Sequence, residues 1–259
     1  MQSNVISSAE TFAANRAVGA VRFDVHLKDG ATRRRELHES GSLRVRFPSP
    51  EQQGLSAVFV NTAGGIAGGD RFDIDIAAND GAHLTVTTAA AEKIYRSHGP
   101  DAQVTILFDR ARVARRIDID LSGNASLLLC EIVVFGRAAM GEVMTQGAFI
   151  DRWRMRIDGK LVFAETVRLN GDIAAKLARR AVAGGGVAIG TALIVPGDEA
   201  IVARIREVSD TFGAEVGISA WNGFAMARFC AQDAARLRAD MMKVLERVSP
   251  SGLPRLWLN

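Results

Sequence analysis

Cysteine, tyrosine and histidine are scarce in this chain of 259 residues, with two, one and four occurrences respectively. Cys130 and Cys230 lie in separate apolar runs, and neither has a cysteine or histidine at the spacing of a metal site. The histidines also occur singly, without the paired spacing typical of zinc ligands. We therefore expect no disulfide framework and no thiolate or imidazole metal site. Buried, reduced thiols are expected instead, as in a cytoplasmic protein.

Long hydrophobic runs and a strong charge imbalance are missing too. No apolar stretch reaches the length of about 18 residues that a membrane-spanning helix needs. Residues 1–18 lack the features of a signal peptide and are expected to be flexible. Lys and Arg number 32 against 29 Asp and Glu, a net charge of +3, so attraction to nucleic acid is expected to be weak. Two basic runs, 32–35 and 110–116, lack interleaved aromatics and are interpreted as solvated or partner-facing edges.

Familiar catalytic motifs are also missing. The sequence has neither the GxSxG motif of serine hydrolases nor the HExxH motif of zinc proteases. Its segment GGIAGGDR, residues 64–71, lacks the Lys and Ser/Thr that complete a phosphate-binding loop, and Asp70 would repel a phosphate. We interpret the glycines as a tight turn and keep Asp70 as a candidate ligand. The chain is not predicted to be an enzyme; the alternative is a β-rich metal-binding protein or hydrolase whose site forms only in three dimensions.

Apolar and polar residues alternate with a period of two along most of the chain, which is the pattern of half-buried strands. Clear examples are 21–27, 43–47, 72–76, 84–88, 104–108, 117–121 and 153–157. A helical period appears at 232–247, where Asp233 favours the first turn and Pro250 follows the last. Strands do not alternate with long helices, so we predict a mainly β, mainly antiparallel architecture, layered or coiled, with a few helices. Residues 19–259 are expected to form a single domain.

Three segments, in order, carry a more specific pattern: NTAGGIAGGD (61–70), LTVTTAAAEKIYRS (84–97) and CEIVVFGRAAMGE (130–142). They resemble the motifs of the urease accessory protein UreD family, called UreH in some organisms, and the ending PRLW (254–257) resembles that of the family. The resemblance extends over most of the chain. The matching residues are Gly64, Gly65, Gly68, Gly69, Asp70, Thr88, Ala89, Lys93, Tyr95, Arg96, Ser97, Glu131, Gly136, Arg137, Gly141 and Glu142.

The resemblance implies an elongated, β-helix-like stack of strands with a non-catalytic role. Proteins of this family act with UreF, and through UreF with the GTPase UreG, to load nickel into apo-urease. The resemblance thus implies transient nickel rather than a tightly bound cofactor, and neither a nucleic acid nor a membrane as partner. Ten matching residues are interpreted as a structural motif: Gly64, Gly65, Gly68, Gly69, Thr88, Lys93, Tyr95, Arg96, Gly136 and Arg137.

Five carboxylates are our candidates for a nickel path or a partner contact: Asp70, Glu92, Glu131, Glu142 and Glu165. Such a path needs oxygen ligands that bind weakly and release quickly. The alternative for each is an ordinary ion pair with a neighbouring arginine, such as Glu131 or Glu142 with Arg137. The family pattern also implies a further strand and a Leu-Pro-Gln/Glu segment before Ile106, and this chain is shortened there.

Overall fold

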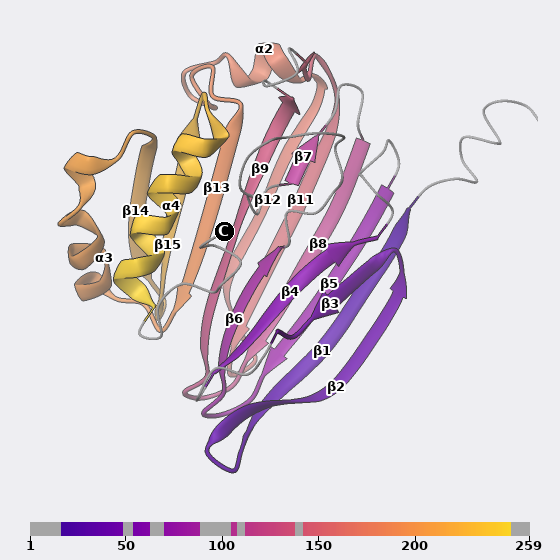
Figure 1. Cartoon of the computed structure of the whole chain (residues 1–259), viewed down its shortest axis with the longest axis vertical. Helices are drawn as coiled ribbons and strands as arrows, with labels where there is room; N and C mark the ends of the chain where they lie inside the picture. Colours follow the sequence, from indigo (N-terminus) through magenta and orange to yellow (C-terminus); the bar gives the residue numbers. More distant parts are fainter. Residues whose placement is uncertain are drawn as a thin grey trace, which may run out of the picture.

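The computed structural model describes residues 17–48, 54–62, 70–88, 105–107, 112–137 and 142–249. Within this part of the chain, two β-sheets pack against each other across a shared apolar core (Figure 1). The first sheet has six strands in the order β12-β11-β8-β5-β1-β2. These strands are β1 (Val18–Lys28), β2 (Ala31–Gly41), β5 (Asp70–Ala78), β8 (Arg112–Leu121), β11 (Gln146–Ile157) and β12 (Lys160–Asp172).

The second sheet has nine strands, of which seven follow the order β14-β15-β13-β9-β6-β4-β3, while β7 and β10 both pair with β9. Its strands are β3 (Leu43–Arg46), β4 (Leu55–Asn61), β6 (His83–Thr88), β7 (Thr105–Leu107), β9 (Ser126–Arg137), β10 (Glu142–Val143), β13 (Ala188–Val195), β14 (Glu215–Trp221) and β15 (Phe224–Ala231). The α-helices of the described part are α2 (Ile173–Leu177), α3 (Glu199–Arg206) and α4 (Ala234–Val248), and a 3₁₀ turn covers Ser209–Thr211.

Apart from the short strands β7 and β10, the strands in the middle of the chain alternate between the two sheets, from β4 through β5, β6, β8 and β9 to β11. Each return to a sheet brings the chain back in the same direction, so β5, β8 and β11 are parallel neighbours, as are β6 and β9. The expected mainly β, layered and β-helix-like fold is confirmed. The expectation of antiparallel neighbours holds for hairpins such as β1–β2 and β11–β12 but is wrong for these central strands. The crossover that a parallel pair requires is made here by a strand of the opposite sheet instead of a helix, so the lack of long crossover helices does not exclude parallel neighbours.

The period-two alternation places apolar side chains between the sheets. Phe23 of β1 and Met155 of β11, from the first sheet, are 1% and 0% exposed, and Leu127 of β9, from the second, is 2% exposed. All three belong to one continuous core. Complete burial of such a side chain stabilises the fold by about 1.5–3 kcal/mol, so this interior holds the two sheets together.

Helices cover the other face of the second sheet at the end formed by β14, β15 and β13 (Figure 1). Ile132 of β9 and Phe229 of β15 pack there against Leu237 and Met241, which lie one turn apart on α4. Asp233 caps the start of α4, because its carboxylate accepts hydrogen bonds from the backbone amides of residues 235 and 236 at 2.7 and 3.1 Å. The predicted C-terminal helix is therefore confirmed.

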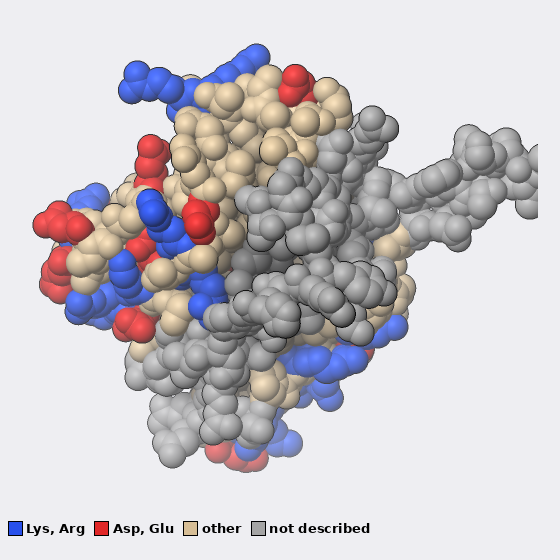
Figure 2. Space-filling model, turned by 45° about the horizontal axis from the view of Figure 1, so that its top comes forward, with Lys and Arg blue, Asp and Glu red and all other residues tan. Residues whose placement is uncertain are grey.

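Charged residues of both signs cover the outside. Figure 2 shows lysine, arginine, aspartate and glutamate side chains intermingled over the end of the molecule formed by α3 and α4. The basic run at 32–35 lies on β2, at one edge of the first sheet, where Arg33, Arg34 and Arg35 are exposed. Arg35 forms an ion pair with Asp24 at 2.9 Å. Among the described helices, none is long and apolar enough to cross a membrane.

Candidate functional site

The second basic run does not behave as a solvated edge. In its described part, Arg116 points outward and pairs with Asp118, but the side chain of Arg115 is only 9% exposed and lies between the sheets. The interpretation of this run as an outer edge is therefore wrong for Arg115. The reason is the period of a strand: two consecutive arginines on β8 must point to opposite faces of the sheet.

Arg115 is held by two buried carboxylates. Its Nη1 and Nη2 atoms donate to Glu131 of β9 at 2.6 and 2.5 Å. Its Nε atom donates to Asp151 of β11 at 2.9 Å, and its Nη2 atom makes a second contact with the same carboxylate. Trp153 donates its indole Nε1–H to Asp151 at 2.8 Å. The guanidinium thus bridges the two sheets with bidentate geometry, which is the strongest form of charge-assisted hydrogen bonding.

A second arginine lies beside this arrangement. Arg228 of β15 donates to Thr191 of β13 through Nη1 at 3.1 Å and to Glu165 of β12 through Nη2. Thr191 is the direct neighbour of both Glu131 and Arg228 in the second sheet, so the three residues form one row across it. We call Arg115, Glu131, Asp151, Glu165 and Arg228 the charge cluster. It contains one more carboxylate than guanidinium groups.

The pKa values of the cluster reflect its burial. Burial raises the pKa of Glu131, and the nearby guanidinium of Arg115 opposes that shift only in part. Burial alone would lower the pKa of Arg115, but the attraction of Asp151 and Glu131 outweighs it and raises the pKa. For Arg228, burial has the larger effect and lowers the pKa, although the carboxylates of Glu131 and Asp151 oppose this shift. Burial, with a smaller contribution from the charge of Asp151, therefore favours uptake of a proton at Glu131.

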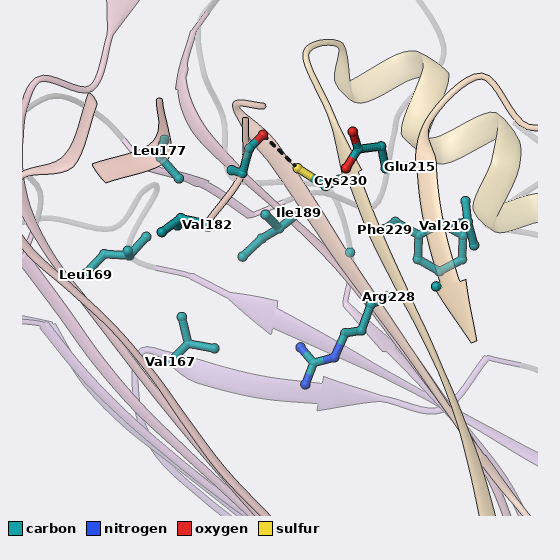
Figure 3. Close-up of a pocket in the computed structure, with 13 residues that line it drawn as sticks. Val167, Leu169, Leu177, Val182, Ile189, Glu215, Val216, Arg228, Phe229 and Cys230 are labelled. Carbon is teal, nitrogen blue, oxygen red and sulfur yellow. Dashed lines mark hydrogen bonds between the residues drawn. The ribbon is translucent and has the colours of Figure 1, made fainter. Parts of the chain in front are cut away.

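Two cavities adjoin the cluster. The inner chamber has a volume of about 20 Å³ and is lined by Glu131, Asp151, Trp153, Glu165 and Arg228, among others. A volume of this size has room for about one water molecule. The outer hollow has a volume of about 480 Å³ and a mainly apolar lining that includes Val167, Leu177, Val182, Ile189, Val216 and Cys230 (Figure 3). Val167, Ile189 and Arg228 line both cavities, so the hollow and the chamber adjoin at these residues.

The structure brings two of the five candidate carboxylates together. Glu131 and Glu165, on different sheets, line the same chamber. Glu131 forms an ion pair with Arg115 of the opposite sheet, so the alternative of an ion pair with an arginine holds for it. Asp70 begins β5 and Glu142 lies opposite Arg137 on the β9–β10 pair, but the side chains of these three residues are outside the described part. Glu92 lies entirely outside it.

The structural-motif residues are described only in part. Gly136 of β9 has a φ of 91°, a backbone conformation that favours glycine. Thr88 ends β6, with its side chain outside the described part. The remaining positions lie outside the described residues: Gly64, Gly65, Gly68, Gly69, Lys93, Tyr95 and Arg96.

Three cluster members, Arg115, Asp151 and Arg228, were missed by the sequence analysis. A signal for two of them was present. In VARRI (113–117) and FIDRW (149–153), Arg115 and Asp151 each lie two residues from a buried apolar residue on both sides, so their side chains point to the same buried face of the strand. A charged residue at an inward position of a strand needs a partner of opposite charge. Arg228 carries a weaker signal, because β15 is apolar on both faces.

The cluster is not a metal site as it stands. In the part of the chain that the structure describes, no group of three or more His, Cys, Asp or Glu residues is arranged to hold a metal ion. The reason is visible in the geometry: guanidinium groups occupy the oxygens of Glu131, Asp151 and Glu165. These carboxylates can accept a metal cation only if a guanidinium moves away.

Comparison with known proteins gives a consistent result. The family model described as "UreD urease accessory protein" matches residues 17–106 and 102–258, two segments that together cover almost the whole chain. "Urease accessory protein UreD" of Rhodopseudomonas palustris (strain HaA2) is 70% identical over 271 residues, covering 98% of this chain and 97% of that protein. The protein of the same name from Bradyrhizobium diazoefficiens is 69% identical over 277 residues, covering all of both chains. "Urease accessory protein UreD 3" of Bradyrhizobium sp. (strain BTAi1) is 65% identical over 271 residues.

Proposed function

Because the chain belongs to the UreD family of urease accessory proteins, we propose that it is a non-catalytic scaffold required for nickel insertion into apo-urease. In this proposal it binds apo-urease and UreF, contacts UreG through UreF, and works in the cytoplasm. Nickel is cargo that passes transiently, and the protein keeps no cofactor of its own.

The observation that supports this role best is the charge cluster between the sheets. Glu131, Asp151 and Glu165 supply carboxylate oxygens, which are hard ligands that hold a divalent first-row cation less tightly than thiolates do. Arg115 and Arg228 compete for the same oxygens, and this competition weakens cation binding further. A delivery protein needs this combination, because a cargo ion has to leave again.

The interior of the fold also suits a route rather than a store. Leu177 of α2 lines the outer hollow, which adjoins the inner chamber at Arg228, and the three carboxylates line that chamber. A storage or sensor protein would be expected to close several imidazole or thiolate ligands around one ion. Here the hollow is mainly apolar, with the acid Glu215 in its lining, and the chamber carries three carboxylates, which attract a small cation and repel anionic molecules.

Gene deletion in a urease-producing cell tests the accessory role. We expect normal amounts of urease protein with low nickel content and low activity, restored when the gene is supplied again. Retention of apo-urease and UreF by the tagged protein is the second expected result. Full urease activity in the deletion strain, or failure of the tagged protein to retain either partner, would count against the proposal.

Complementation with point variants tests the route separately. Glu131→Gln and Glu165→Gln remove one negative charge each and keep the side-chain shape, so they should lower urease activation most clearly when nickel is limiting. Glu199→Gln, at an exposed position at the start of α3, is the matched control. If the deletion abolishes activation but both chamber variants restore it fully, the accessory role stands and the path through the cluster is wrong.

A further inference from the structure

We propose that Arg228 is the residue that controls whether a divalent cation reaches the carboxylates of the inner chamber. This inference rests on the proposed nickel route and adds the point at which that route is opened and closed. In the structure Arg228 occupies the closed position, bound to Glu165 on one side and Thr191 on the other. Glu165 and Thr191 belong to opposite sheets, so the Arg228 side chain fills the space between the sheets at this point.

The position of Arg228 supports this role. It belongs to the lining of both the outer hollow and the inner chamber. Figure 3 shows its guanidinium reaching from β15 across the hollow toward Val167 of β12. A positive charge at the junction opposes the approach of a cation, and the long side chain also fills the passage. Removal of the side chain should therefore widen the junction and reduce the electrostatic barrier together.

The two arginines of the cluster differ in how firmly they are held. Arg115 is 9% exposed and binds two carboxylates, each through two contacts. Arg228 is 40% exposed and binds a single carboxylate, Glu165, which is itself 31% exposed. Ion pairs that water reaches contribute about 1 kcal/mol or less, whereas breaking a buried pair costs several times more. Arg228 can therefore swing toward the solvent of the hollow while Arg115 stays in place.

The net charge of the chamber depends on whether the Arg228 side chain lies inside it or outside, and a divalent cation matches the charge of the second state. With Arg228 inside and all three carboxyl groups ionised, the carboxylates face two guanidinium groups, and one negative charge is in excess. With Arg228 outside, they face Arg115 alone, and the excess is two negative charges. A single divalent cation balances that excess. Arg228 and the cation thus compete for the same place, and departure of the cation allows Arg228 to return.

Quenching of Trp153 fluorescence by Ni²⁺ measures access to the chamber directly. Trp153 lines the chamber and is 5% exposed. The chain has two other tryptophans, Trp221 and Trp257, so a W221F/W257F background leaves Trp153 as the single reporter. In this full-length background, Arg228→Ala should raise the quenching constant for Ni²⁺ by about fivefold, equivalent to about 1 kcal/mol of lost barrier. Arg228→Gln, which keeps more of the bulk, should give a smaller increase.

Arg168→Ala is the matched control, because Arg168 is an exposed arginine of β12 that lines neither cavity. Its quenching constant should equal that of the background protein. Unfolding curves establish that each variant is folded. The proposal is overturned if neither Arg228 variant increases quenching, or if Trp153 of the background protein is already quenched as readily as an exposed indole. Because urease takes no part in this measurement, its result is independent of whether nickel delivery follows the proposed path.

Discussion

Replacement of Arg115 by methionine should destabilise the protein more than any other single change in the charge cluster. Methionine has a similar length and no charge, so the packing loss is small. Glu131 and Asp151, both with side chains only 6% exposed, would lose the cation that binds them. Removal of one partner from a buried ion pair costs about 3–5 kcal/mol. This is a large part of the roughly 5–15 kcal/mol by which a domain is stable.

The loss of unfolding free energy in Arg115→Met should depend on pH, and the pKa values of the buried carboxyl groups determine whether it grows or shrinks as the pH rises. Burial raises the pKa of Glu131 above its ordinary value of 4.5 even with Arg115 present, and loss of Arg115 raises it further. A group whose pKa is raised in the folded state contributes stability below its unfolded pKa, and this contribution is lost as the pH rises through the folded pKa. The deficit of the variant should therefore grow with pH, by about 1.4 kcal/mol per unit for each carboxyl still protonated only in the folded state.

Urea denaturation at about pH 5 and about pH 8 measures both effects. Arg168→Met, on the exposed side of β12, is the control, and its free energy of unfolding should change by no more than about 0.5 kcal/mol. A deficit of Arg115→Met that is the same at both pH values would indicate lost packing instead of unpaired charge. A deficit below about 1 kcal/mol at the higher pH would mean that water already solvates the two carboxylates, and the reasoning would fail.

Three further changes test other parts of the fold. Asp240→Ala should lower the free energy of unfolding by about 2–3 kcal/mol in urea, because its buried carboxylate accepts hydrogen bonds from the amides of residues 213 and 214 at 2.8 and 2.7 Å; Asp240→Asn should cost less. Gly41→Ala should lower the melting temperature far more than Gly159→Ala. A Cβ at Gly41 would lie 1.6 Å from the carbonyl oxygen of Val18, whereas at Gly159 it would meet nothing within 4 Å, although both glycines have a positive φ. Cys130 should resist iodoacetamide in the folded protein and react only after unfolding, since burial raises the pKa of its thiol to about 12; mass spectrometry of the alkylated protein measures this.

Local patterns predicted the elements well because their periods depend on neighbouring residues alone. The alternation in VRFDVHL (21–27) gave a strand of the first sheet, and the apolar spacing after Asp233 gave α4. Strand direction was not accessible in the same way. Whether β5 and β8 run parallel depends on the path of the chain through the opposite sheet, and no property of either strand records that path.

The candidate site, too, was predictable from local sequence only in part, because its assembly depends on contacts between distant strands. Glu131 and Glu165 were chosen singly as carboxylates, but nothing in the sequence indicated that they line one chamber. Their meeting depends on the pairing of Trp153 with Glu165 in one sheet and of Thr191 with Glu131 in the other. The inward parity of Arg115 was readable, and that parity alone predicts a buried anionic partner. Which of the many acids would be that partner required the register.

Register and charge also specify each other in this fold. A slip of β8 by one residue would turn Arg115 to the outer face and place Arg116 between the sheets, reversing every other side chain of the strand as well. The apolar neighbours Ile117 and Ile119 already disfavour this slip. A slip by two residues would keep the apolar side chains between the sheets, but it would move Arg115 by about 6.6 Å along the strand, too far for the bidentate contacts with Glu131 and Asp151. A buried ion pair contributes little net stability compared with apolar packing. Its value here is that it distinguishes the native alignment of β8, β9 and β11 from alignments that bury nearly as much apolar surface.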